Sequence, residues 1–140
     1  MAAPSARNID ISTERWSLKE PFVISRGVKT TADVVVVTLQ DGRHRGRGEA
    51  VPYARYGETI DGVVAALEAL RHALPNRQKL SGVLPPGAAR NALDCALWDL
   101  ESKQTGKSVV DTVGLGKLSE LRTAFTLSLD TPEKMAAAAR

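Results

Sequence analysis

The chain has 140 residues and a mass of 15.0 kDa, a length typical of one domain with room for a hydrophobic core. Its residues are 43% hydrophobic and 25% charged, and no apolar run approaches the ~20 residues of a membrane-spanning helix. The net charge of +3 is too small to indicate nucleic-acid binding, and a single cysteine excludes an internal disulfide and a cysteine-based metal site. We therefore expect a cytoplasmic protein with no nucleic-acid or membrane partner.

The first half of the chain carries the signals of a small antiparallel sheet. Apolar and polar residues alternate over 8–18, and a β-branched run covers 33–40. The Asp41-Gly42 pair then predicts a tight hairpin into a third strand over 43–50, whose arginines share a solvated face. Gly46 and Gly48 lie on the opposite face, so we expect another element to pack closely against them. These patterns predict a three-stranded meander.

Helical patterns follow the strands. Thr59 is placed to cap a helix that ends near Leu74, a short helical turn is expected over 77–83, and Val109–Val113 predicts another short piece. The clearest helix covers 86–104, and we expect Cys95 within it to be a small buried side chain. Its apolar stripe comprises Ala89, Ala92, Leu93, Ala96, Leu97 and Leu100. Strands followed by helices indicate an α+β fold.

The last twenty residues differ from the rest. Residues 123–129 predict a strand, and Thr131-Pro132-Glu133 has the cap, proline and acid of a helix start. One strand and about nine residues of helix cannot close a parallel sheet. We therefore expect a piece of a longer protein, with one domain over 1–120 and the start of a second over 121–140.

The spacing of the histidines and of two aspartates does not match that of a metal site or a catalytic carboxylate pair. His44 and His72 fall on different elements, which argues against a zinc site. Asp94 and Asp99 are five apart on the main helix and point to different faces, so they do not form a carboxylate pair.

Two connections are better candidates for binding. The stretch Glu20–Lys29 is long for a link between two strands and combines apolar residues with Arg26, as a binding lid would. The stretch Pro52–Glu58 is similar and contains two tyrosines. From composition alone a surface ion pair is the better interpretation of Arg26, although a guanidinium in such a loop suits a carboxylate ligand.

Four stretches carry a resemblance to a known family: Pro21–Gly27, Gly48–Glu58, Pro86–Lys103, and Thr126 with the helix start at Thr131. They resemble the N-terminal part of enolase-superfamily enzymes of the mandelate racemase and muconate lactonizing group, in particular dipeptide epimerases acting on L-Ala-D/L-Glu. The resemblance implies an enolase-type capping domain, a three-stranded antiparallel meander followed by a helical bundle. The first strand and partial helix of a (β/α) barrel would follow it.

The resemblance also implies an activity for the full-length protein. Such isomerases move the proton α to a carboxylate with the help of Mg²⁺, and their lysines and metal ligands belong to barrel strands beyond residue 140. This chain alone is expected to be inactive, and the full-length form could be a homo-oligomer. The partner implied is a small dipeptide, and the implied substrate-binding residues are Arg26, Thr126, Phe22, Ile24, Tyr53 and Tyr56.

Two alternatives remain open at this point. The chain could be the cap of another family member, such as a muconate cycloisomerase, an o-succinylbenzoate synthase or an N-acylamino acid racemase. It could instead be a non-catalytic α+β binding module, although the unfinished helix at Arg140 argues against that interpretation.

Overall fold

The computed structural model describes residues 7–140, and the chain divides into two units. The first unit contains residues 33–117 together with the beginning of the chain through Glu14. The second contains residues 15–32 and 118–140. Residues 1–6 of the predicted first domain lie outside the described residues, and the predicted boundary at 120 stays a prediction.

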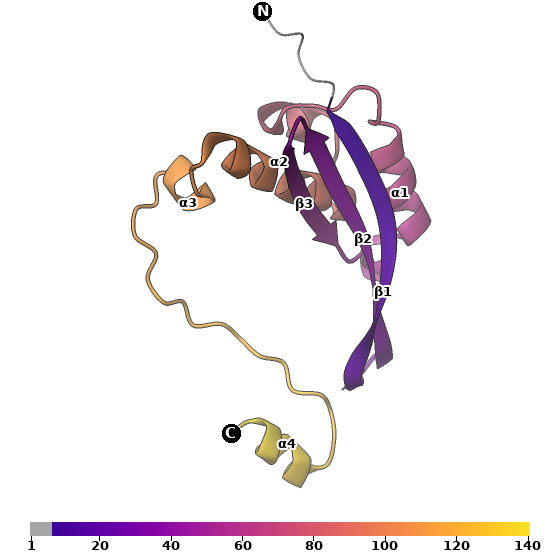
Figure 1. Cartoon of the computed structure of the whole chain (residues 1–140). Coiled ribbons are helices and arrows are strands. Elements are labelled where there is room, and N and C mark those ends of the chain that lie inside the picture. The colour runs from indigo at the N-terminus through magenta and orange to yellow at the C-terminus, as the bar shows by residue number, and fades with distance from the viewer. Residues whose placement is uncertain (1–6) are drawn as a thin grey trace, which may run out of the picture. The chain divides into compact units, whose positions relative to one another are not determined.

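Three strands form the sheet, in the order β1-β2-β3 (Figure 1). They are β1 (Asn8–Ile24), β2 (Gly27–Asp41) and β3 (His44–Ala50). Strands β2 and β3 are antiparallel, with Leu39 opposite Gly46 and Val37 opposite Gly48. Gly42 supplies the turn between them with a φ of +55°, which favours glycine. The antiparallel meander predicted from the sequence is confirmed.

The remaining elements are helical. They are η1 (Ala54–Tyr56), α1 (Ile60–Glu68), η2 (Arg77–Gly82), α2 (Ala88–Thr105), α3 (Val109–Thr112) and α4 (Pro132–Ala138). Thr59 caps α1 by accepting a hydrogen bond from the Gly62 amide, and Thr131 caps α4 in the same way from Lys134, both as predicted. None of the helices over residues 7–140 combines the length and apolar character needed to cross a membrane.

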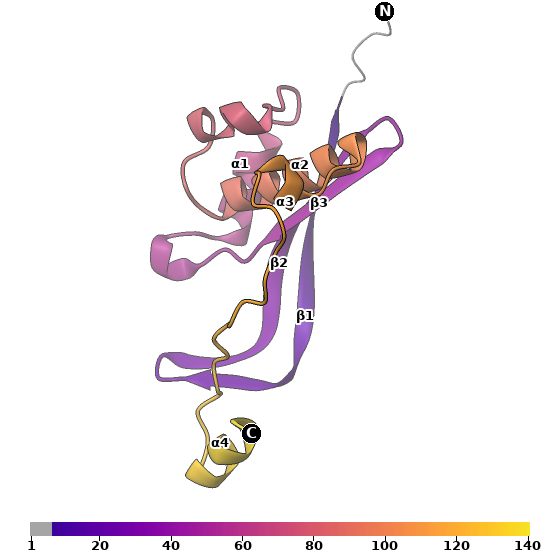
Figure 2. The same cartoon turned by 90° about the vertical axis from the view of Figure 1, so that its left-hand side faces the viewer.

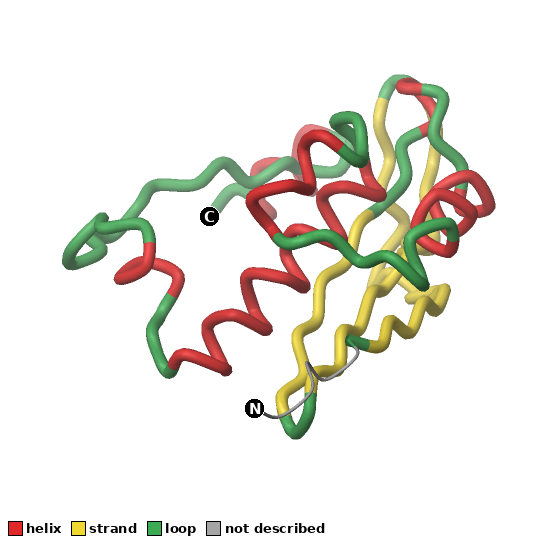
Figure 3. Tube along the Cα trace, turned by 90° about the horizontal axis from the view of Figure 1, so that it is seen from above, coloured by secondary structure: helices red, strands yellow, loops and turns green. Residues whose placement is uncertain are grey.

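The core of the first unit lies between one face of the sheet and helices α1 and α2, seen from above in Figure 3. Every second residue of β2 points into it, from Val35 to Leu39, as the two-residue period of a strand requires. Leu67 of α1 is fully buried there. The predicted stripe of α2 is confirmed, with Ala92, Leu93, Ala96, Leu97 and Leu100 all buried.

Two glycines of β3 let α2 approach the sheet closely. A Cβ atom at Gly46 would overlap the carbonyl oxygen of Ala96 and lie 2.6 Å from the backbone nitrogen of Leu100. A Cβ atom at Gly48 would overlap the carbonyl oxygen of Ala92 and lie 2.6 Å from the backbone nitrogen of Ala96. The close packing predicted from these glycines is confirmed.

Polar side chains of α2 bind the free edge of β3. The Arg47 amide donates to Asp99 Oδ2 at 2.8 Å, and Lys103 Nζ donates to the Arg45 carbonyl at 2.9 Å. Lys103 also pairs with Asp99 at 2.7 Å. Burial alone would raise the pKa of Asp99, but the hydrogen bonds from Lys103 and the Arg47 amide outweigh it and lower that pKa. Side chains of α2 thus satisfy one amide and one carbonyl of β3 without another strand.

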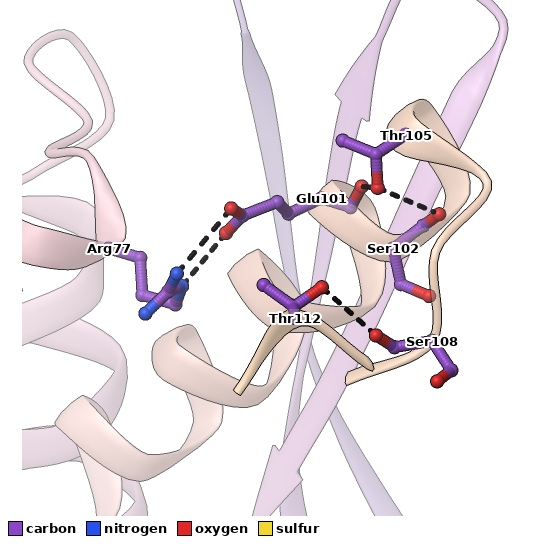
Figure 4. Close-up of polar contacts among 6 residues, drawn as sticks. All are labelled: Arg77, Glu101, Ser102, Thr105, Ser108 and Thr112. Carbon is purple, nitrogen blue, oxygen red and sulfur yellow. Dashed lines mark hydrogen bonds and ion pairs between the residues drawn. The ribbon is translucent and has the colours of Figure 1, made fainter. Parts of the chain in front are cut away.

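The C-terminal half of α2 is held by side-chain bonds to its neighbours (Figure 4). Arg77 pairs with Glu101 at 2.8 Å and its guanidinium lies 3.4 Å from the centre of the Trp98 ring. The Thr105 hydroxyl donates to the Glu101 carbonyl at 2.8 Å, close to the end of the helix at Gly106. The two contacts of Arg77 therefore tie η2 to α2, and the Thr105 bond lies within α2 itself.

The connection over Glu20–Lys29 is not the long loop that was predicted. Strand β1 continues to Ile24 and β2 starts at Gly27, so the link is a tight turn at Ser25 and Arg26 (Figure 2). The segment is therefore the end of a β-hairpin arm. Its strands are exposed on both faces over most of their length, so the alternation of apolar and polar residues that marks a half-buried strand is missing.

Three further predictions need correction. Helix α1 ends at Glu68 rather than near Leu74, because the amides of residues 70, 71 and 73 bond carbonyls three residues back in tighter turns. Cys95 is exposed rather than buried, although its Cβ atom lies close to Gly48 of β3. Residues 123–129 form no strand, because the hydrogen bonds described between this segment and β1 come from Ser128 and Leu129 at its end, and a single backbone bond among them is too few for a strand ladder.

Candidate functional site

The residues predicted to bind substrate form one group in each unit. Tyr53 and Tyr56 belong to the first unit, in the loop between β3 and α1. The second unit contains the hairpin arm, with Phe22, Ile24 and Arg26, and the segment that contains Thr126.

The loop of the first unit is a single 3-10 turn that brings its two tyrosines together. The Tyr56 amide donates to the Tyr53 carbonyl at 2.9 Å, and the two ring centroids lie 5.6 Å apart at 60°. Gly57 ends the turn with a φ of +74°. Tyr56 is 77% exposed, so its ring is accessible to a ligand.

Glu58 fixes this loop, and sequence analysis assigned it no role. One carboxylate oxygen accepts from the Tyr53 amide at 2.9 Å, and the other accepts from the Ala88 amide at 2.6 Å. The Ala88 bond caps α2, whose own N-cap residue, Gly87, has no side chain to do so. The missing cap residue before α2 is the sequence signal that could have revealed this bond.

The two amides also favour the charged form of the carboxylate. The hydrogen bond from Ala88, and then that from Tyr53, lower the pKa of Glu58 below its ordinary value of 4.5. Its stabilising effect is therefore present above pH 4.5 and is lost as the pH falls through the lower pKa of the folded state.

This gives a pH-dependent prediction for Glu58→Gln. The wild type is expected to unfold at a higher temperature than the variant at neutral pH, and the difference should shrink as the pH falls below 4.5. Thermal unfolding of both proteins, followed by circular dichroism across that pH range, measures the effect. A difference that stays constant with pH would contradict the assignment of the low pKa to Glu58.

An open groove runs beside the loop in the first unit, with a volume of about 630 Å³. It is lined by residues 56–59 at the end of the loop, by Gly62, Val63 and Ala66 of α1, and by residues 84–89 at the start of α2. Most of these residues are apolar or glycine, and the groove lies where the loop meets the first turns of both helices.

In the second unit, Arg26 lies at the tip of the hairpin arm and is exposed. Phe22 and Ile24 precede it on β1 and are half-buried. A guanidinium on an exposed tip, next to apolar side chains, can bind a carboxylate while the apolar residues cover the rest of the ligand.

Hydrogen bonds join the arm to the segment that contains Thr126. The Ser128 hydroxyl accepts from the Val23 amide at 2.9 Å and lies 3.3 Å from the Pro21 carbonyl, to which it donates. The Leu129 amide donates to the Val23 carbonyl at 2.9 Å. The structure thus brings the strand of Phe22 and Ile24 beside the segment of Thr126, which itself is exposed.

Ser128→Ala is expected to loosen this joint by about 1 kcal/mol, because the Val23 amide and the Pro21 carbonyl each lose a partner. Hydrogen exchange of the Val23 amide should become severalfold faster. The exposed Ser119 provides a control, since Ser119→Ala removes a hydroxyl from the same segment of the chain. Equal exchange in both variants would show that Ser128 does not hold the arm.

Among residues 7–140 the structure groups no three histidine, cysteine, aspartate or glutamate side chains that could hold a metal ion.

Comparison with known proteins adds to this geometry. The family of the mandelate racemase / muconate lactonizing enzyme N-terminal domain matches residues 6–114. The chain is 42% identical over 133 residues to L-Ala-D/L-Glu epimerase of Escherichia coli K12, covering 93% of this chain and 41% of that protein. It is 40% identical over 107 residues to N-acetyl-D-glutamate racemase of a Pseudoalteromonas species, covering 73% and 34%.

A solved structure is also similar. It is an enolase family member of Agrobacterium tumefaciens with homology to dipeptide epimerases, described with bound sodium and L-Ala-L-Glu. The TM-score is 0.87 at 50% sequence identity, over 95% of this chain and 42% of that one. The chain thus spans about two fifths of the length of the Escherichia coli epimerase and of this solved structure. The chain belongs to the mandelate racemase and muconate lactonizing enzyme family and corresponds to its N-terminal domain.

Proposed function

We propose that this chain is the substrate-specificity cap of a Mg²⁺-dependent dipeptide epimerase that acts on L-Ala-D/L-Glu. The proposal rests on one observation, which is that three of the similar proteins are named or described with molecules that contain glutamate. The two curated relatives and the solved structure are named for glutamate-containing molecules, a dipeptide in two of them and an N-acetyl amino acid in the third. The exposed Arg26 offers the cation that a glutamate side chain would pair with.

The residues of this chain have binding roles in the proposal. Arg26 holds the distal carboxylate, Phe22 and Ile24 cover the apolar part of the ligand, and Thr126 contacts its backbone. Tyr53 and Tyr56, in the first unit, are assigned to substrate binding as well. Fixing the ligand at both ends places its α carbon reproducibly, which is how a cap contributes to the rate without reacting itself.

Magnesium stabilises the negative charge that forms on the substrate carboxylate in such reactions. Residues 7–140 include no group of three histidine, cysteine, aspartate or glutamate side chains that could hold a metal, and we assign the ligands of the ion and the catalytic lysines to the part of the protein outside this chain. We also assign the whole protein to the cytoplasm.

The function is tested on the complete protein with Mg²⁺ and L-Ala-L-Glu in D₂O. We expect the α proton of the glutamate residue to be lost from the ¹H NMR spectrum as L-Ala-D-Glu forms. N-acetyl-glutamate, a dipeptide without an acidic side chain and muconate are assayed in parallel. Turnover of muconate, or of none of these compounds, would overturn the proposal.

One alternative has an observation in its favour. The similarity to an N-acetyl-D-glutamate racemase makes an N-acylamino acid a second candidate substrate, because it presents the same distal carboxylate to Arg26. Faster turnover of N-acetyl-glutamate than of L-Ala-L-Glu would select this alternative.

A further inference from the structure

The loop from Tyr53 to Glu58 is closed on itself by one side chain. Glu58 Oε2 accepts from the amide of Tyr53 at 2.9 Å, so the first and last residues of the loop are joined directly. Inside this ring the Gly57 amide donates to the Ala54 carbonyl at 3.0 Å. Both tyrosines are part of this closed backbone, which fixes the positions of their Cα atoms.

The same carboxylate attaches the loop to the helical layer. Glu58 Oε1 accepts from the Ala88 amide at 2.6 Å, at the start of α2. The next residue, Thr59, accepts from the Gly62 amide at 3.0 Å, at the start of α1. Two consecutive side chains therefore bind the first turns of two different helices, which fixes the end of the loop against both.

The residue before Ala88 leaves space for the carboxylate. A Cβ atom at Gly87 would lie 2.8 Å from Glu58 Oε1, and Gly87 has a φ of +155° that few other residues adopt. Gly87 therefore leaves room for the carboxylate to reach the Ala88 amide. The half-buried carboxylate keeps its charge because both amides favour the ionised form.

We infer that Glu58 is the positioning residue of the substrate-facing loop, holding Tyr53 and Tyr56 in place through its two backbone hydrogen bonds. This inference rests on the proposed function, because it assigns the loop to substrate binding. A simple helix cap would need only the Ala88 bond. The second bond, from the Tyr53 amide, links the start of the loop through the same carboxylate to the first turn of α2.

The kinetic test uses the complete protein and the variants Glu58→Ala, Glu58→Gln and Asp61→Asn. We expect Glu58→Ala to raise KM for L-Ala-L-Glu about tenfold, with kcat changed less than about twofold, because the loop contacts the ligand and not the reacting atoms. Glu58→Gln should recover part of the affinity, since its amide oxygen can still accept from one of the two N–H groups. Asp61→Asn removes an exposed charge from the first turn of α1 and should behave as the wild type.

Hydrogen exchange provides a readout that does not depend on activity. In Glu58→Ala the amides of residues 53–57 should exchange at least about tenfold faster, whereas those of Val35–Leu39 in the core keep their protection. A variant that is less stable, with unchanged KM and unchanged loop exchange, would overturn the inference and leave Glu58 as a helix cap. If the wild type turns over no dipeptide, the proposed function fails, and unchanged loop exchange would still reject the role of Glu58.

Discussion

Gly48→Ala is expected to lower the free energy of unfolding of the first unit by about 3 kcal/mol, the upper part of the range for overpacked cores. The added methyl group would overlap the carbonyl oxygen of Ala92, which belongs to the helix backbone and cannot rotate away. Either α2 moves off the sheet, or β3 bends. Both changes separate the apolar stripe of α2 from the fully buried Val37 and Leu39 of β2.

Chemical denaturation of the complete protein, followed by far-UV circular dichroism, measures this effect. Gly82→Ala is the matched control, since a Cβ atom there has no neighbour within 4 Å and the backbone does not need a positive φ. The control should change stability by less than about 0.5 kcal/mol. Equal stability of the two variants would mean that α2 does not lie as close to β3 as the structure places it.

The second large effect concerns Arg26, at the tip of the hairpin arm. Arg26→Ala should lower kcat/KM of the complete enzyme for L-Ala-L-Glu by about 10- to 100-fold, the factor that follows from losing a hydrogen bond to a charged group worth ~1.5 to 3 kcal/mol. The guanidinium is exposed, so its removal leaves no buried group unpaired within the protein.

The substrate side chain and a second cation of the arm provide the controls. L-Ala-L-Leu lacks the distal carboxylate, so its turnover should change less than about threefold in Arg26→Ala. Lys19→Ala removes an exposed positive charge from the same arm and should leave both substrates unaffected. An equal decrease in kcat/KM for both dipeptides would show that Arg26 supports the structure of the arm and does not bind the acidic side chain of the substrate.

The features predicted best from the sequence are those that depend on neighbours along the chain. The period of two in β2, the stripe of α2 and the caps at Thr59 and Thr131 are all local, and each is present in the structure. The glycines of β3 also predicted a tertiary contact, because a strand without side chains on one face is stable only when another element covers it.

The features predicted poorly depend on partners that periodicity does not encode. The hairpin arm has little buried face, so its strands lack the pattern that identifies a half-buried strand. Cysteine is a residue type that is usually buried, but Cys95 is exposed and lies just outside the buried stripe of α2. Glu58 bonds the amide of Ala88, thirty residues away, and only the three-dimensional structure brings these two residues together.

The bonded edge of β3 determines how this sheet can grow. Exposed strand edges are where peptides add by β-augmentation and where folded chains aggregate. Here Asp99 and Lys103 already bond the Arg47 amide and the Arg45 carbonyl, two of the groups that an added strand would use. A fourth strand grafted beside β3 would first have to displace both side chains, so protein engineers who wish to extend this domain have to replace them or build elsewhere.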